Sequence, residues 1–217
     1  MTASAKAEWP LPDALLALSI VPLLAGAVRL VQLGSGAPVT AENARYFAAP
    51  LPVVLHLVSV TVYCVLGAFQ FAAGFRRRQP NWHRAAGRVL VPCGLVAALS
   101  GLWMTQFYPP GSEPPASFDG PFVYALRLLA GSAMALSLCL GLAAVRRRDI
   151  PRHRAWMLRA YALGIAAGTQ VLTHLPWFMF PSIRGELARA LCMAAGWVLN
   201  LALAEWLISR QRRRQAA

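Results

Sequence analysis

The stretch at residues 146–177, RRRDIPRHRAWMLRAYALGIAAGTQVLTHLPW, decides how this sequence folds. It joins an arginine triplet, a helix start, two histidines and a row of small residues. The same order of arginine triplet and His-Arg pair occurs earlier, as RRRQPNWHR at residues 76–84. In both copies the histidine, His83 or His153, comes five residues after the triplet's last arginine, and the copies are 70 residues apart. This pattern predicts an internal repeat of two helix–basic loop–helix units.

The composition indicates a membrane protein. Of the 217 residues, 58% are hydrophobic and only 13% are charged, which is too apolar for a soluble domain of this size. Stretches of roughly 20 apolar residues are long enough to cross a bilayer as helices. We predict an all-α bundle of six transmembrane helices forming one domain over residues 1–217, with the second and third spans repeated by the fourth and fifth. The predicted spans are 11–33, 52–75, 82–107, 122–145, 151–175 and 186–209.

The basic residues predict the orientation. The net charge is +13, and the arginines lie in blocks between the apolar spans. Membrane topology and anionic lipid headgroups therefore account for the charge, and a nucleic-acid partner is not expected. The blocks follow the second, fourth and last spans, whereas the other loops hold little beyond Arg45 and Arg184. The positive-inside rule then places both termini in the cytoplasm. Asn81 and Asp149 are predicted helix caps, and the tail RQRRRQAA is predicted to be disordered.

The sequence lacks motifs that several classes of enzyme require. No H-E-x-x-H, aspartate-rich, G-x-S-x-G or paired Glu-x-x-His motif occurs in the sequence, and whether the protein is an enzyme stays open. The four cysteines fall one per predicted span without a C-x-x-C pair. They are interpreted as small apolar side chains rather than disulfide or zinc residues: Cys64, Cys93, Cys139 and Cys192.

Three motifs resemble a known family. GAFQF at residues 67–71, HRAAGR at 83–88 and HRAWMLRAYAL at 153–163 are similar to the bacterial integral membrane proteins grouped as domain of unknown function 2306, DUF2306. The resemblance covers residues 51–176 and implies a multi-pass protein of the bacterial cytoplasmic membrane. It supports His56, His83 and His153 as site residues but implies no activity. An arginine that the family tends to place late in the fifth span is absent here, and His174 is not part of the family pattern.

The four histidines are predicted to form two layers. Paired histidines from different helices at one depth are what a b-type haem requires, and such a protein would pass electrons to a quinone or another redox partner. His83 and His153 are the inner pair of candidate axial ligands, and His56 and His174 the outer pair. Because 21 residues of helix separate His153 from His174, about 31 Å, the inner pair is preferred. Gly87 would leave room for the macrocycle, and Arg84 and Arg154 would hold its propionates.

Other interpretations stay open. The histidines could bond loop carbonyls at the membrane interface, and the small residues could serve helix packing alone. A second function is binding or transport of an anionic or amphipathic small molecule or lipid in the cleft between the repeats. Its anion contacts would be Arg84, Arg88, Arg154 and Arg159. A third is a non-catalytic scaffold subunit of a membrane complex.

Overall fold

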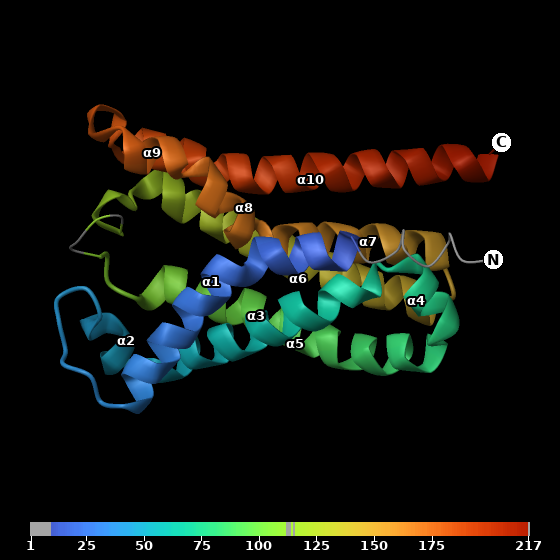
Figure 1. The fold of residues 1–217 in the computed structure, drawn as a ribbon, viewed down its shortest axis with the longest axis horizontal. Helices are drawn as coiled ribbons and strands as arrows, with labels where there is room; N and C mark the ends of the chain where they lie inside the picture. Colours follow the sequence, from blue (N-terminus) through green and yellow to red (C-terminus); the bar gives the residue numbers. More distant parts are fainter. Residues whose placement is uncertain (1–9, 112–113, 115, 217) are drawn as a thin grey trace.

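The computed structural model describes residues 10–111, 114 and 116–216. Within these residues every regular element is a helix (Figure 1), and five helices are long and apolar enough to cross a membrane. The predictions of an all-helical chain and of a membrane protein are confirmed. The five helices are α1 (Pro10–Gly34), α3 (Pro50–Gln70), α5 (Pro80–Phe107), α6 (Pro121–Arg146) and α10 (Glu186–Ala216).

The fifth predicted span, residues 151–175, is not one helix. The structure divides it into α7 (Ile150–Gly164), α8 (Ala166–Thr173) and α9 (Leu175–Met179), so the prediction of a continuous helix is wrong. Pro176 explains the second break, because a proline has no N–H to bond the carbonyl four residues earlier. Figure 1 shows the three helices following one another along the length of the bundle.

Several predicted boundaries also need correction. Helix α3 ends at Gln70 rather than at residue 75, and the first arginine triplet lies in a short helix, α4 (Ala73–Arg78). Gln79, not Asn81, is the N-cap of α5. The Asp149 prediction is confirmed, since its carboxylate accepts the Arg152 N–H at 3.0 Å. The tail RQRRRQAA, which was predicted to be disordered, is helical up to Ala216, where α10 ends.

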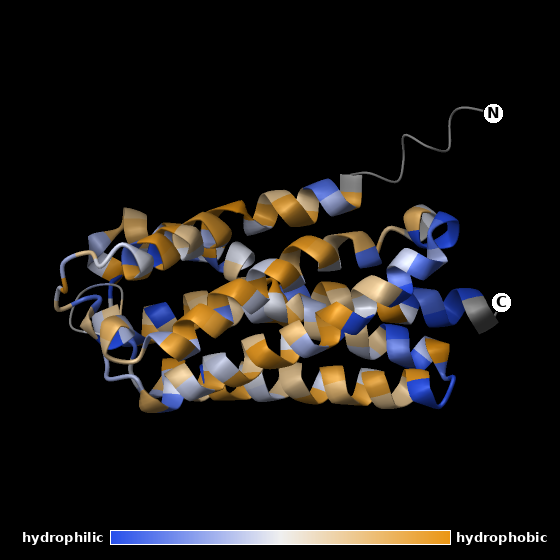
Figure 2. Cartoon of the chain, turned by 90° about the horizontal axis from the view of Figure 1, so that it is seen from below, coloured by the Kyte–Doolittle hydropathy of each residue, from blue (hydrophilic) through white to orange (hydrophobic). Residues whose placement is uncertain are grey.

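The predicted loops hold short helices. Residues 34–50 contain α2 (Ala44–Ala48), and 3₁₀ turns occupy Ala116–Phe118 and Pro181–Ile183. The helix bundle has two ends that differ in composition. The basic end carries the arginines of α4, of the α6–α7 loop and of the last turns of α10, and the α2 end carries α2 and α9. Figure 2 shows hydrophilic colour gathered at the basic end and apolar colour along the middle of the bundle.

Packing follows the chain order. Helix α3 lies against α5, α5 against α6 and α6 against α7, while α10 runs along α6, α7 and α8. The core is centred on Tyr63, Leu138 and Tyr161, and the Tyr161 hydroxyl donates to the Cys64 carbonyl at 3.0 Å. A Cβ at Gly67 would overlap the Tyr161 ring, so the small residues of the GAFQF motif serve close packing.

The internal repeat stays a prediction. The N-caps of α5 and α7, Gln79 and Asp149, are 70 residues apart, as are the two histidines that follow them. The units differ elsewhere, because α3 ends at Gln70 whereas α6 continues to Arg146. Helix α5 also runs unbroken to Phe107, whereas α7 is interrupted after Gly164.

Candidate functional site

The inner histidines lie at the basic end, in the first turns of α5 and α7. The N–H of His83 donates to the Gln79 carbonyl at 3.1 Å, and the N–H of His153 donates to the Asp149 carbonyl at 2.9 Å. His83 also lies within electrostatic range of His153. The structure therefore brings the predicted inner pair to one end of the bundle, at equivalent helix positions.

The two rings differ in their partners. His153 Nδ1 lies 2.9 Å from the Gly141 carbonyl of α6, which tightens the α6–α7 contact. In the first unit, the residue at the position of Gly141 is Phe71, which is the C-cap of α3. His83 Nδ1 is buried and has no hydrogen-bond partner in the described part of the chain. A Cβ at Gly87 would meet no atom within 4 Å, so the space predicted beside that glycine is open.

Arginines crowd the basic end. Arg84, Arg88 and Arg154 are exposed, and the Gln211 amide of α10 lies against the Arg154 guanidinium. Arg76 is half-buried and donates to the Gln70 carbonyl at 3.3 Å. Burial and the charges of Arg154 and Arg77 lower the pKa of Arg76. The electrostatic potential at this end is strongly positive, which suits anionic lipid headgroups.

One predicted anion contact has a partner within the chain. Arg159 of α7 forms a bidentate ion pair with Glu205 of α10, with N–O distances of 2.5 and 2.9 Å, and lies over the Trp156 ring at 4.6 Å. This pair was not predicted from the sequence. The signal was present, because Glu205 is an acid inside a predicted apolar span and such a charge needs a partner. The pair fastens α10 to α7.

The predicted outer histidines lie toward the α2 end but differ in their surroundings. His56 Nδ1 is 2.9 Å from the Ala97 carbonyl, and the ring lines a large cavity. His174 Nδ1 is 2.7 Å from the Gln170 carbonyl of its own helix run, and its buried Nε2 has no partner among the described residues. His174 is not among the described residues that line the cavity.

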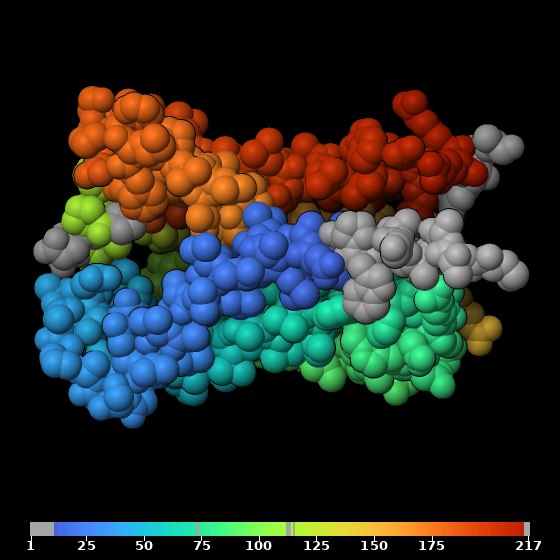
Figure 3. Space-filling view, viewed as in Figure 1, coloured from blue at the N-terminus to red at the C-terminus, as the bar shows by residue number. Residues whose placement is uncertain are grey.

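The cavity is the main site that the sequence did not reveal. It has a volume of about 690 Å³, is open on one side, and is lined mainly by α1, α3, α5, α6, α7 and α8 toward the α2 end. Figure 3 shows the molecule hollowed between α1 and the α8–α9 segment at that end. Apolar side chains from α3, α6 and α7 form the deep part, including Val60, Met134 and Leu163. The cavity is therefore lined by helices of both predicted repeat units.

Arginines dominate the charges of the cavity mouth. Among the described lining residues, the charged side chains are Arg29, Arg45, Arg127 and Asp119. The guanidinium groups of Arg29 and Arg45 both lie over the Tyr46 ring, at 4.5 and 4.9 Å. Two positively charged guanidinium groups therefore lie beside the same aromatic ring at the mouth.

Neighbouring groups hold these arginines in place. Arg45 donates to the Pro109 carbonyl at 3.3 Å and to the Tyr46 hydroxyl at 2.9 Å. Glu42 approaches Arg29 at 3.7 Å, but its side chain is 63% exposed, so it neutralises the cavity weakly. Among the described residues, the charges of Arg29 and Arg45 therefore stay largely uncompensated.

Asp119 organises the opposite wall. Its two oxygens bind Arg127 of α6 and Arg189 of α10, each at 2.7 Å. The Arg189 side chain is only 9% exposed, so this carboxylate neutralises a buried guanidinium. Neither this network nor the cavity mouth was predicted from the sequence. Arg29 and Arg127 are arginines within predicted apolar spans, which is the signal that could have identified them.

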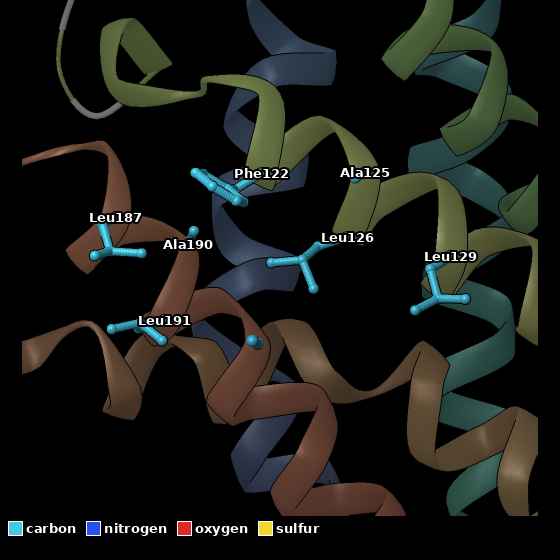
Figure 4. A pocket seen from close by; sticks show the side chains of 8 residues that line it. Phe122, Ala125, Leu126, Leu129, Leu187, Ala190 and Leu191 are labelled. Atoms are coloured by element: carbon cyan, nitrogen blue, oxygen red, sulfur yellow. The ribbon is translucent and has the colours of Figure 1, made fainter.

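A second hollow is apolar throughout. It lies on the outside of the bundle between α6 and α10, with a volume of about 330 Å³. Figure 4 shows Phe122, Leu126 and Leu129 of α6 facing Leu187 and Leu191 of α10 across it. A groove without polar groups on a membrane helix is the expected contact surface for lipid chains.

The described residues do not indicate a metal site built from three or more protein ligands. No cluster of three or more His, Cys, Asp or Glu side chains suited to a metal ion occurs among the residues that the structure describes. The four cysteines are free, as predicted. A two-histidine haem site is a different arrangement, which this observation does not address.

Comparison with known proteins gives one match. A family model described as "Predicted membrane protein (DUF2306)" matches residues 53–208. The matched segment includes most of α10 and therefore extends past the motifs quoted above, whereas α1 and α2 lie outside it. No curated protein and no solved structure matches the sequence significantly.

Proposed function

Since the chain belongs to the DUF2306 family of predicted membrane proteins, whose description names no activity, we propose a function from the cavity. The protein binds, and in a transport role would pass on, a small amphipathic anion held between the two helix units. The observation that carries this proposal is the combination of an arginine-rich mouth with an apolar interior in one cavity of about 690 Å³. Cavities of roughly 300–1,000 Å³ are typical of small-molecule sites.

The charge balance supports an anion. Guanidinium groups bind carboxylate and phosphate oxygens through paired hydrogen bonds. Asp119 satisfies Arg127 and Arg189 together, while Arg29 and Arg45 share Tyr46 rather than a buried acid. Arginines inside a membrane bundle are costly unless a counter-charge is near, so a bound anion would stabilise the mouth.

Binding should depend on the charge of the headgroup. A fluorescent dodecanoic acid is expected to bind the purified protein in nanodiscs, and its methyl ester to bind at least about tenfold more weakly, because a charge-assisted hydrogen bond contributes about 1.5–3 kcal/mol. Arg127→Gln and Arg29→Gln should each weaken binding of the acid by a similar factor and leave the ester unchanged. Fluorescence titration measures both.

The control for these variants is Arg184→Gln. Arg184 lies over Trp177 at 5.4 Å toward the same end but does not line the cavity. Its removal should leave the affinity for the acid unchanged. Equal affinities for acid and ester, or an equal loss in all three variants, would contradict an anion site at the mouth.

The proposed membrane arrangement has six crossings, with the α7–α8–α9 run as the fifth and an internal two-unit repeat. The positive-inside rule then faces the basic end and both termini toward the cytoplasm of a bacterial inner membrane. Reporter fusions after Arg78, Arg148 and Arg214 are expected to behave as cytoplasmic. Fusions within residues 34–50 should behave as external. A cytoplasmic signal from that loop would reverse the side from which the cavity opens.

A b-type haem at the basic end is the second candidate. The favouring observation is the bond between His153 Nδ1 and Gly141, since a carbonyl partner at Nδ1 leaves Nε2 as the nitrogen that ligates a metal. His83 and the open space at Gly87 would complete the site. Bound haem would supply one-electron chemistry, with a quinone as a suitable partner.

The haem candidate makes a spectroscopic prediction. Protein purified from haem-supplemented cells should show a Soret band that His83→Ala or His153→Ala removes. Gly87→Leu should also remove it by filling the open space, without loss of folded protein. A preparation without Soret absorption contradicts this candidate, and absence of both haem and anion binding would leave the scaffold role.

A further inference from the structure

Helix α1 forms one wall of the cavity and is weakly held by the bundle. Only 6% of the residues in its apolar window are buried, against 22–33% in the other membrane helices. Large apolar side chains such as Leu24, Val28 and Val31 are more than half exposed. Toward the α2 end, Gly26 and Arg29 of α1 line the cavity.

A proline marks where α1 can bend. Pro22 lies inside the helix and has no N–H, so the Leu18 carbonyl loses its intrahelical donor. That same carbonyl lies against Gly168 of α8, where an added Cβ would overlap its oxygen. The two helices therefore cross at a tight contact beside the break in the hydrogen-bond ladder. Proline positions of this kind are the usual sites of helix bending.

Beyond this crossing the two helices separate. Figure 1 shows α1 and the α8–α9 segment diverging toward the α2 end, and Figure 3 shows the surface hollowed between them. Residues of both helices line the cavity there, Ala25 and Gly26 on α1 and Gln170 on α8. Most residues that line the cavity belong to the apolar spans, which bilayer lipid would surround.

We propose that the ligand is a single-chain amphiphile that enters sideways from the bilayer between α1 and α8. Its carboxylate or phosphate head lies at Arg29, Arg45 and Arg127, and its hydrocarbon chain extends toward Met134 and Leu163. The segment of α1 after Pro22 moves outward about the Leu18–Gly168 crossing to admit it. This inference rests on the proposed anion-binding function and adds the tail and the route.

The first experiment tests the tail on the unmodified protein. Acetate, octanoate and dodecanoate compete against the fluorescent fatty acid in nanodiscs, with each concentration expressed as the mole fraction in the lipid phase, or as free solute for acetate. Acetate should not compete, and dodecanoate should bind better than octanoate at equal lipid mole fraction, because the longer chain fills more of the cavity. The gain per added methylene group should stay below the roughly fourfold that transfer from water would give, since the chain leaves lipid rather than water. Acetate competing as well as dodecanoate would overturn the inference while keeping the anion site. No competition and no binding by any of them would overturn the proposed function instead.

The second experiment tests the route. Pro22→Ala restores the missing hydrogen bond, which each opening must then break, so exchange of the bound fatty acid between nanodiscs should slow by about five- to tenfold. Pro22 itself lines the cavity, but none of the arginines of the mouth changes, so the equilibrium affinity should stay within about twofold.

The matched control is Pro92→Ala, which makes the same change inside α5 at an exposed position that does not line the cavity. It should leave the exchange rate unchanged. An unchanged exchange rate in Pro22→Ala, or equal slowing in both variants, would overturn the lateral route. Should Pro22→Ala fail to fold, the chain-length series on the unmodified protein still decides whether the tail is recognised.

Discussion

Asp119→Ala is expected to destabilise the folded protein by about 3–5 kcal/mol, because removing one partner leaves a buried charge uncompensated. Asp119 binds both Arg127 and Arg189 at 2.7 Å, and the Arg189 side chain is only 9% exposed. Without the carboxylate, two guanidinium groups of like charge face each other with no acid between them. The midpoint of thermal unfolding in detergent, followed by circular dichroism, should fall steeply.

Glu42→Ala supplies the comparison for this change. It also removes a carboxylate from an arginine at the α2 end, but the Glu42–Arg29 distance is 3.7 Å and Glu42 is 63% exposed. An exposed pair of this kind contributes about 0–1 kcal/mol. Similar losses in the two variants would show that Asp119 has no special structural role. Asp119→Asn should fall between them, since it keeps hydrogen-bond acceptors but loses the charge.

The membrane helices were predictable because hydrophobic length alone determines them. All five long helices begin within two residues of their predicted starts, as α5 does at Pro80 against a predicted 82. The breaks after Gly164 and at His174 were not predicted, since apolar composition does not change there. Pro176 explains the break at His174. At the first break, the residues closest to Gly164 are Tyr63 of α3 and Met134 of α6, which are distant in the sequence.

The candidate site was less predictable than the fold. The sequence repeat identified His83 and His153, and the structure places them at one end, but a cavity arises from how helices diverge in space. Nothing in the local sequence of α1 or α8 reveals that they separate beyond Leu18 and Gly168. Single charges in apolar spans were the usable signal, because each needs a partner or a ligand. Glu205 forms an ion pair with Arg159, whereas Arg29 lines the cavity.

The same helix crossing makes Gly168 the position where the smallest substitution should have a large effect. Gly168→Ala adds one methyl group where the Leu18 carbonyl already touches α8, and this neighbour is backbone that cannot rotate away. Alanine is the better helix former by about 1 kcal/mol, but overpacking of this kind costs about 1–3 kcal/mol or more.

We therefore expect Gly168→Ala to be destabilising by about 1–2 kcal/mol, and Gly168→Val by more, because valine adds further atoms at the contact and is a poorer helix former. Unfolding in a denaturing detergent titration measures the loss. Gly87→Ala is the matched control, since a Cβ there meets no atom within 4 Å, and it should be neutral or stabilising. If Gly168→Ala is as stable as Gly87→Ala, then α1 does not lie against α8 as the structure has it. The crossing about which α1 is proposed to move would then be lost as well.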